Sequence, residues 1–161
     1  MSLLVVGSIA IDTVETPSGR RHGLLGGSAS HFSLAARFFT PVRLVSVVGG
    51  DWPAEHTEFL ASRGIDVSGI QVVPTGKSFR WTGRYQPNMN DRETLDIELD
   101  VFGKFEPQIS DAFRRSEFVF LANAAPTTQL KTLEQVPGRR LVVADEHQHE
   151  GGRLDEDEPD V

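Results

Sequence analysis

The segment GLLGGSASHFSLAARF, residues 23–38, places two adjacent glycines directly before a predicted helix. Ser28 or Ser30 can cap the exposed N–H groups at the start of this helix. Gly26 and Gly27 either let a ligand approach the backbone or form an ordinary tight turn, since glycine serves both purposes. Apolar residues recur with the spacing i, i+3, i+4 and i+7, which predicts one apolar helix face made of Phe32, Ala35, Ala36 and Phe39.

The sequence on either side of this segment alternates strands with helices. Residues 3–6, LLVV, and residues 42–50, VRLVSVVGG, are apolar runs typical of buried strands. Pro41 ends the first helix. A second helix is expected after Asp51, which suits the N-cap position, and Gly64 ends it.

Two β-rich segments interrupt this order. Residues 11–23 resemble a β-excursion with a turn at Pro17–Gly19, and residues 65–100 alternate in part between apolar and polar side chains. A helix, a strand, a helix and a strand are then expected at residues 107–116, 117–122, 126–136 and 139–145. The whole order predicts an α/β fold with a parallel sheet core of four strands, fewer than such a sheet usually has.

Composition and charge exclude several classes of protein. The 161 residues suit one domain and include no cysteine, which excludes disulfides, zinc-thiolate sites and a cysteine nucleophile. The net charge is −7 and no basic patch is present, so a nucleic-acid partner is not expected. Seven acidic residues and one arginine lie within residues 146–161, which are predicted to form a disordered acidic tail. The chain has neither a long apolar run nor a basic leader, so we expect a cytoplasmic protein without a membrane partner.

The sequence matches two nucleotide-binding motifs only in part. A dinucleotide fingerprint needs G-x-G-x-x-G between a strand and a helix, and the pair Gly26-Gly27 has no third glycine. In PTGKSF, residues 74–79, a phosphate-binding loop would need a glycine where Gln71 stands. The residues after it predict a strand and not a helix, so we expect a β-turn there.

Other polar residues are weaker candidates when taken alone. Asp12 follows the first strand, where the carboxyl ends of parallel strands face a ligand crevice, and it can accept hydrogen bonds from hydroxyl groups or be a solvated turn residue. His147 and His149 lack a structured third ligand, so no metal site is expected. The serines lack the G-x-S-x-G context of a hydrolase nucleophile.

Five segments taken together resemble a known family. They are VVGSIAIDTV (5–14), GLLGGSASHFSLAA (23–36), LVSVVGGDWPAEHTEFLASRGIDVSGI (44–70), FVFLANAAP (118–126) and LVVAD (141–145). In this order they resemble the N-terminal part of the ribokinase-like (PfkB) carbohydrate kinases. The resemblance implies one domain over residues 1–145, an incomplete α/β/α sandwich with a small β-sheet lid built from about residues 11–23 and 70–99.

The resemblance also implies a set of substrate-binding residues. Asp12 matches the aspartate that binds sugar hydroxyls, and Gly26 and Gly27 match the glycine pair whose backbone lies against the sugar. His31 stands where many members have an asparagine that contacts the sugar, a departure that counts against a ribose-type substrate. Asn123 falls near a polar residue on the substrate side. Arg80, Trp81 and Tyr85 are the implied lid contacts, and a homodimer through the lid is one implied assembly.

The family's second motif, D-T-x-G-A-G-D, does not occur between residues 101 and 161. In the family this motif carries the catalytic base and the phosphate-binding glycines, so no catalytic residue is assigned here. The resemblance implies ATP-dependent phosphorylation of a sugar or a sugar-like alcohol with Mg²⁺, by a fold of which this chain carries the sugar side and the lid. The chain alone is expected to be inactive and to bind ATP and Mg²⁺ poorly. A non-catalytic sugar-binding or regulatory module, or a truncated product without function, are the alternatives.

Overall fold

The computed structural model describes residues 2–145. The segment 146–161, which the sequence predicts to be disordered, lies outside the described residues. In chain order the elements are β1 (Leu3–Val6), β2 (Ala10–Thr16), β3 (Gly19–Gly26), α1 (Ser28–Ala36), β4 (Val42–Gly49), α2 (Ala54–Ser62), β5 (Asp66–Val73), β6 (Arg80–Tyr85), β7 (Arg92–Glu98), the 3₁₀ turn η1 (Asp100–Lys104), α3 (Asp111–Arg114), β8 (Phe118–Leu121), α4 (Pro126–Gln135) and β9 (Leu141–Ala144).

The body of the molecule is built on a five-stranded sheet with the order β5-β4-β1-β8-β9, here called the large sheet. All of its neighbouring strands are parallel, and Leu3 of the central strand lies opposite Val42 and Phe118. The central strands are apolar without alternation because both of their faces are covered. The expected parallel core is therefore confirmed, with one strand more than the sequence predicts.

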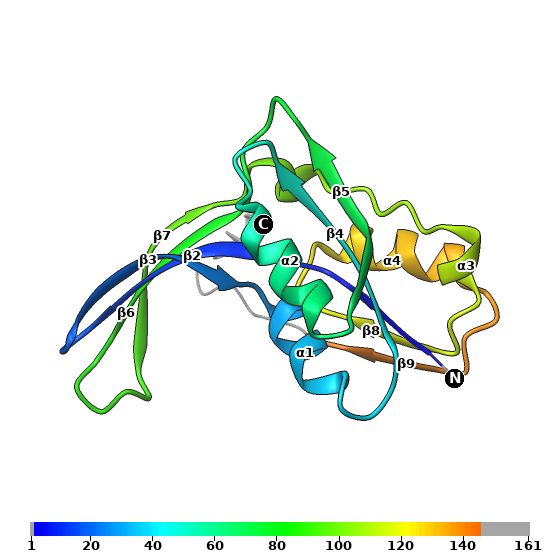
Figure 1. Ribbon diagram of the computed structural model, residues 1–161, viewed down its shortest axis with the longest axis horizontal. Helices are drawn as coiled ribbons and strands as arrows, with labels where there is room; N and C mark the ends of the chain where they lie inside the picture. The colour runs from blue at the N-terminus through cyan, green and yellow to red at the C-terminus, as the bar shows by residue number, and fades with distance from the viewer. Residues whose placement is uncertain (1, 146–161) are drawn as a thin grey trace, which may run out of the picture.

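Helices cover both faces of the large sheet (Figure 1). One core joins β1, β4 and β8 to α1 and α2 through residues such as Val5, Leu44 and Leu60. The other core packs the opposite side chains of the same strands against the segment from η1 to α4, through residues such as Leu4 and Phe113. The result is a three-layer α/β/α body.

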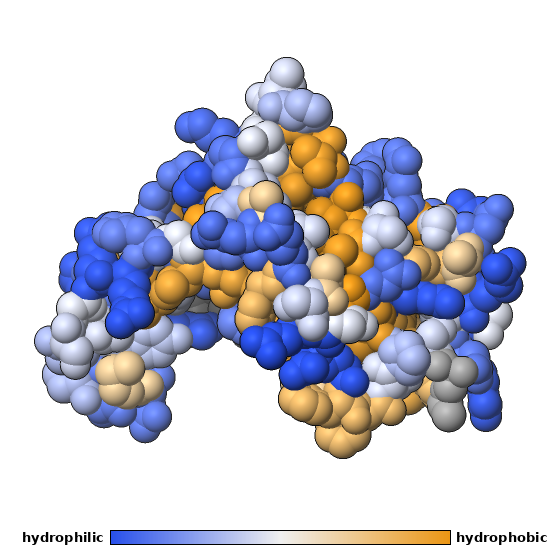
Figure 2. All heavy atoms as spheres, viewed as in Figure 1, coloured by the Kyte–Doolittle hydropathy of each residue, from blue (hydrophilic) through white to orange (hydrophobic). Residues whose placement is uncertain are grey.

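The remaining strands form a second sheet with the order β3-β2-β6-β7, here called the small sheet. It extends from the body as a curved arm (Figure 1). Figure 2 shows an apolar band on the arm next to the body and hydrophilic residues toward its tip. Residues 70–73, which the family resemblance implies to be part of the lid, belong instead to β5 of the large sheet, where Gly69 and Ile70 pair with Val45 and Ser46.

The predicted apolar face of α1 is only partly correct. The helix ends at Ala36, so Phe39 lies in the following turn and is 88% exposed. The buried residues of α1 are Ala29, Ser30 and Ser33, which are small. The Ser30 hydroxyl satisfies its own hydrogen bonding by donating to the backbone carbonyl of Gly26. Of the predicted face, Phe32 and Ala36 do pack against the core, and Phe32 stacks on Phe120 of β8 with the ring centroids 3.5 Å apart.

The predicted helix caps are also wrong. The hydroxyl of Ser8, and not that of Ser28 or Ser30, accepts the hydrogen bond from the first amide of α1. The N-cap of α2 is Pro53, which makes no side-chain capping bond. The Asp51 carboxylate instead accepts a hydrogen bond from the amide of Ser78. These long-range partners could not be read from local spacing.

Further along the chain, the helix predicted at residues 107–116 shortens to the single turn α3. Extended chain leads into it, with Phe105 and Ile109 buried in the core. Among residues 2–145, no helix is long and apolar enough to cross a membrane.

Candidate functional site

A network of hydrogen bonds joins the carboxyl ends of β1 and β8 to the start of α1. Ser8, after β1, donates its amide to the carbonyl of Asn123, after β8, at 3.2 Å. The amide of Asn123 donates to the Ser28 hydroxyl at 2.8 Å, and the Ser28 amide donates to the Ser8 hydroxyl at 3.2 Å. This network holds the first residues of α1 against the carboxyl ends of two parallel strands. The carboxyl ends of such strands are where α/β proteins bind ligands.

Gly27 makes the tight approach of α1 to β1 sterically allowed. Its φ is +93°, and a β-carbon there would lie 2.4 Å from the Ser8 carbonyl oxygen. The amides of Ser28 and Ala29 both donate to Ser8, through its hydroxyl and its carbonyl. Because these two amides are already bonded, they do not offer free donors to a phosphate, although helix N-termini often bind anions.

Gly26 makes room for the carboxylate of Asp12. A β-carbon on Gly26 would lie 2.1 Å from the carboxyl carbon of Asp12. The two residues come from the paired strands β2 and β3, whose register places Asp12 opposite Leu24. The carboxylate therefore lies directly over the backbone of Gly26.

The Asp12 carboxylate has an unsatisfied oxygen. Oδ1 is buried and has no hydrogen-bond partner among the described residues. Burial raises the pKa of Asp12 from 3.8 to about 6, although the positive charge of Arg92 opposes the shift. A buried acceptor without a donor is costly, and a ligand hydroxyl would satisfy it.

Most of the residues expected to bind substrate lie together around Asp12 and Gly26. The Asp12 carboxylate contacts Gly26, and Gly27 follows Gly26 in the chain. Asn123 is joined to the start of α1 by the hydrogen bond from its amide to the Ser28 hydroxyl. His31 lies in the first turn of α1 with an exposed side chain, and its amide donates to the Gly27 carbonyl. Ser8 and Ser28 were missed because a lone serine after a strand has no distinguishing local pattern.

A row of side chains crosses the small sheet at Asp12. Asp12 lies opposite Leu24 of β3 on one side and opposite Trp81 of β6 on the other, and Trp81 lies opposite Ile97 of β7. Directly opposed residues share one face of a sheet. Tyr85 lies on the same face, four residues beyond Trp81 along β6.

Arg80 lies on the other face of the small sheet and joins it to the body. Its guanidinium donates to Oδ2 of Asp51 at 2.6 Å, while the amide and hydroxyl of Ser78 donate to Oδ1 at 2.7 and 2.8 Å. Burial raises the pKa of Asp51, but these bonds from Arg80 and Ser78 outweigh it, so the pKa is lower than usual. Asp51, the residue expected as a cap, therefore links the end of β4 to the start of β6 in the small sheet.

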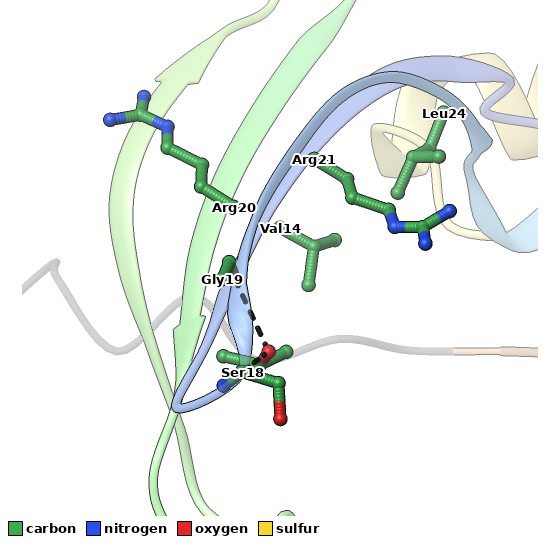
Figure 3. Close-up of a pocket in the computed structure, with 7 residues that line it drawn as sticks. Val14, Ser18, Gly19, Arg20, Arg21 and Leu24 are labelled. Atoms are coloured by element: carbon green, nitrogen blue, oxygen red, sulfur yellow. Dashed lines mark hydrogen bonds between the residues drawn. The ribbon is translucent and has the colours of Figure 1, made fainter.

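A cavity of about 270 Å³ lies on the hairpin of β2 and β3, beyond Asp12 toward the tip. Val14, Arg21 and Leu24 line it together with residues of the turn. Figure 3 shows Arg21 and Leu24 extending to the same side of the hairpin, while Arg20 extends to the other side. Leu24 also lies opposite Asp12 in the sheet, but Asp12 itself does not line this cavity.

Within residues 2–145, no three His, Asp or Glu side chains gather in a way that could hold a metal ion.

Comparison with known proteins identifies the fold. No protein-family model matches the chain. The cytidine kinase of Thermococcus kodakarensis is 31% identical over 147 residues, which make up 89% of this chain and 51% of that protein. A nucleoside kinase of the ribokinase family from Methanocaldococcus jannaschii superposes with a TM-score of 0.74 at 19% identity, over 91% of this chain and 52% of that one. The resemblance to the ribokinase-like family is confirmed.

This chain matches only part of the length of the ribokinase-like proteins. Ribokinase from Cryptococcus neoformans, solved with ADP, gives a TM-score of 0.71 at 18% identity, over 86% of this chain and 49% of that one. This chain therefore spans about half the length of the relatives it matches. Structures with this fold hold ADP, or ATP with Mg²⁺, which are the cofactors that the resemblance implies.

Proposed function

We propose that this chain forms the acceptor-binding side of a ribokinase-like kinase, which transfers the γ-phosphoryl group of ATP to a hydroxyl of a sugar or nucleoside. The observation that carries the proposal is the buried, unpaired oxygen of Asp12 above Gly26. An ionised carboxylate accepts hydrogen bonds only, and neighbouring hydroxyls of a sugar ring are donors that both of its oxygens can bind.

A ribose-containing acceptor agrees with this site, although His31 departs from the asparagine common in the family. A neutral imidazole carries one donor and one acceptor, so it keeps hydrogen-bonding capacity for a sugar hydroxyl. His31 lies in the first turn of α1, the helix that Gly27 begins. The relative with the highest identity quoted above is a cytidine kinase, which also favours a ribose-containing acceptor.

The small sheet acts as a lid in this proposal. It carries Asp12 and Trp81 on one face and is joined to the body through Asp51 on the other. Closure over a bound acceptor would exclude water from the hydroxyl that reacts.

Phosphoryl transfer needs a catalytic base and groups that bind the phosphates. Neither a catalytic base nor a phosphate cradle is assigned among residues 2–145, so the chain alone is expected to bind an acceptor without phosphorylating it.

Calorimetry and a phosphorylation assay on the full 161-residue chain test this function. We expect cytidine or a free sugar to bind, and Asp12→Asn to weaken that binding by about 10- to 100-fold, the range for hydrogen bonds to a charged group. We expect no phosphorylated product with ATP and Mg²⁺. Binding that is indifferent to Asp12→Asn, or turnover at an ordinary kinase rate, would contradict the proposal.

A further inference from the structure

The edge of the large sheet at β9 has no partner strand among residues 2–145. β9 pairs with β8 on one side only, and it is the last strand in the order of the sheet (Figure 1). An unpaired edge strand carries a row of free N–H and C=O groups, which another strand can bind. The sequence of β9, LVVA, contains neither a charged residue nor a proline, which are the residues that usually prevent such pairing.

The hydrogen bonds to β8 decide which backbone groups of β9 point outward. The amides of Leu141 and Asp145 donate to carbonyls of β8 and of the residue before it, at 3.4 and 2.8 Å. Backbone groups alternate in direction along a strand, so the N–H and C=O of Val142 and Ala144 point away from β8. Val142 therefore presents one donor and one acceptor at the middle of the edge.

One face of β9 is apolar and open to solvent. Leu141 and Val143 lie beside Phe118 and Phe120 of β8, on the face of the large sheet that bears α1. Phe32 of α1 stacks on Phe120, but Leu141 and Val143 remain 54% and 49% exposed. Strands of a parallel sheet are normally covered on both faces, so this open strip is unusual. It runs directly to the unpaired edge.

The two ends of β9 carry opposite charges. Arg139 and Arg140 precede the strand, and the side chain of Arg140 is 72% exposed. Asp145 follows the strand, and seven further acidic residues lie within residues 146–161. A parallel neighbour of the same sequence would place like charges together. An antiparallel neighbour places the arginines of each copy beside the acidic residues of the other, so the charges favour an antiparallel second copy.

We propose that two copies of this chain form a dimer by antiparallel pairing of their β9 strands. A twofold axis perpendicular to the sheet places Val142 opposite the same residue of the second copy, so that the outward N–H of each donates to the C=O of the other. In this register Leu141 lies opposite Val143 of the second copy, which joins the two open apolar strips. Arg139 lies opposite Asp145. The two large sheets become one continuous sheet, and the twofold contact closes with two copies.

A single introduced cysteine tests this register, because the chain has no cysteine of its own. Val142→Cys places two thiols across the twofold axis, where opposed residues of an antiparallel pair have Cα atoms about 5.5 Å apart, a separation that a disulfide spans. We expect mild oxidation of the full 161-residue variant to give a covalent dimer on a non-reducing denaturing gel. Val72→Cys is the matched control and should stay monomeric on that gel, because Val72 is an exposed valine on β5, the opposite edge strand of the sheet.

Sedimentation velocity tests the dimer without a cross-link. We expect wild type to sediment as a dimer, and Val143→Lys to raise the dissociation constant of the dimer by at least about tenfold, because the lysine would lose water beside Leu141 of the second copy. Val72→Lys should leave this constant unchanged.

Three outcomes would overturn the inference. A monomeric wild type would mean that a second copy does not cover β9. A dimer that Val143→Lys leaves intact forms through another surface, such as the lid. Equal cross-linking of Val142→Cys and Val72→Cys would show random collision in place of a fixed register. None of these results bears on the proposed function, because β9 contributes no residue to the acceptor site.

Discussion

The carboxylate of Asp12 lies over Gly26 so closely that a β-carbon on the glycine would come within 2.1 Å of the carboxyl carbon. Sequence spacing could suggest only that the glycine pair admits something close to its backbone. The structure shows that what first occupies this space is a carboxylate of the same chain, with one oxygen left for a ligand.

Gly26→Ala should therefore weaken acceptor binding by displacing the Asp12 carboxylate. A methyl group cannot share this space, so the carboxylate must move away from the glycine backbone. Calorimetry with cytidine should show a loss of at least about tenfold, comparable with the loss of a hydrogen bond to a charged group. Gly138→Ala is the matched control, because open space surrounds Gly138 and its backbone is not left-handed. Equal affinities of the two variants would mean that Gly26 does not position Asp12.

Gly27→Ala should destabilise the fold more than Gly64→Ala. Both glycines have a positive φ, +93° and +79°, so each substitution adds backbone strain of about 1–2 kcal/mol. Only Gly27 also meets backbone atoms, because a β-carbon there would lie 2.4 Å from the Ser8 carbonyl oxygen. Urea denaturation should give the larger loss of unfolding free energy for Gly27→Ala, and equal losses would exclude the steric contribution.

The stability of the chain should depend on pH through Asp12. Burial raises its pKa from 3.8 to about 6, so the folded state binds more protons than the unfolded state between these values. Stability from this group is therefore greatest below pH 3.8 and falls as the pH rises toward 6. Asp12→Asn should raise the melting temperature relative to wild type above pH 6, and the gain should vanish near pH 4. A melting temperature that Asp12→Asn lowers at pH 8 would contradict the assignment of a destabilising buried charge.

Asp51→Ala should loosen the attachment of the small sheet. It removes the acceptor for three hydrogen bonds, two from Ser78 and one from Arg80, and leaves the buried Ser78 amide without its partner. The expected cost is roughly 1–3 kcal/mol of unfolding free energy, with faster hydrogen exchange at the Ser78 amide. Asp66→Ala is the control, because Asp66 binds only the nearby Ser68 in the interactions described. Unchanged exchange at Ser78 would show that Asp51 does not hold this segment.

Local pattern was sufficient for four of the five strands of the large sheet, β1, β4, β8 and β9, and for the hairpin at Pro17–Gly19. These elements follow from apolar runs and from turn residues, which act over a few positions. Gly64 likewise ends its helix as predicted, with a φ of +79°. The register that aligns Trp81 with Asp12 depends on a parallel pairing between distant segments, so no local pattern could reveal it.

Long-range chemistry explains where the sequence predictions were wrong. Asp51 has the residue type and position of a helix cap, but Ser78 and Arg80 offer it more donors than the helix does. Phe39 continues the helical spacing, but the helix ends three residues earlier and leaves it exposed. Within the site, residue types could be matched to a family, whereas the unpaired Oδ1 of Asp12 became visible only from the packing around it.

The central claim is that the Asp12 carboxylate accepts hydrogen bonds from a ligand hydroxyl. The most direct measurement is the pKa of Asp12, followed by the ¹³C chemical shift of its carboxyl carbon with and without saturating cytidine. We predict a value of about 6 in the free chain and a lower one with cytidine bound, because hydrogen bonds donated to the charged form favour it. A pKa that stays the same at saturating cytidine would contradict the account.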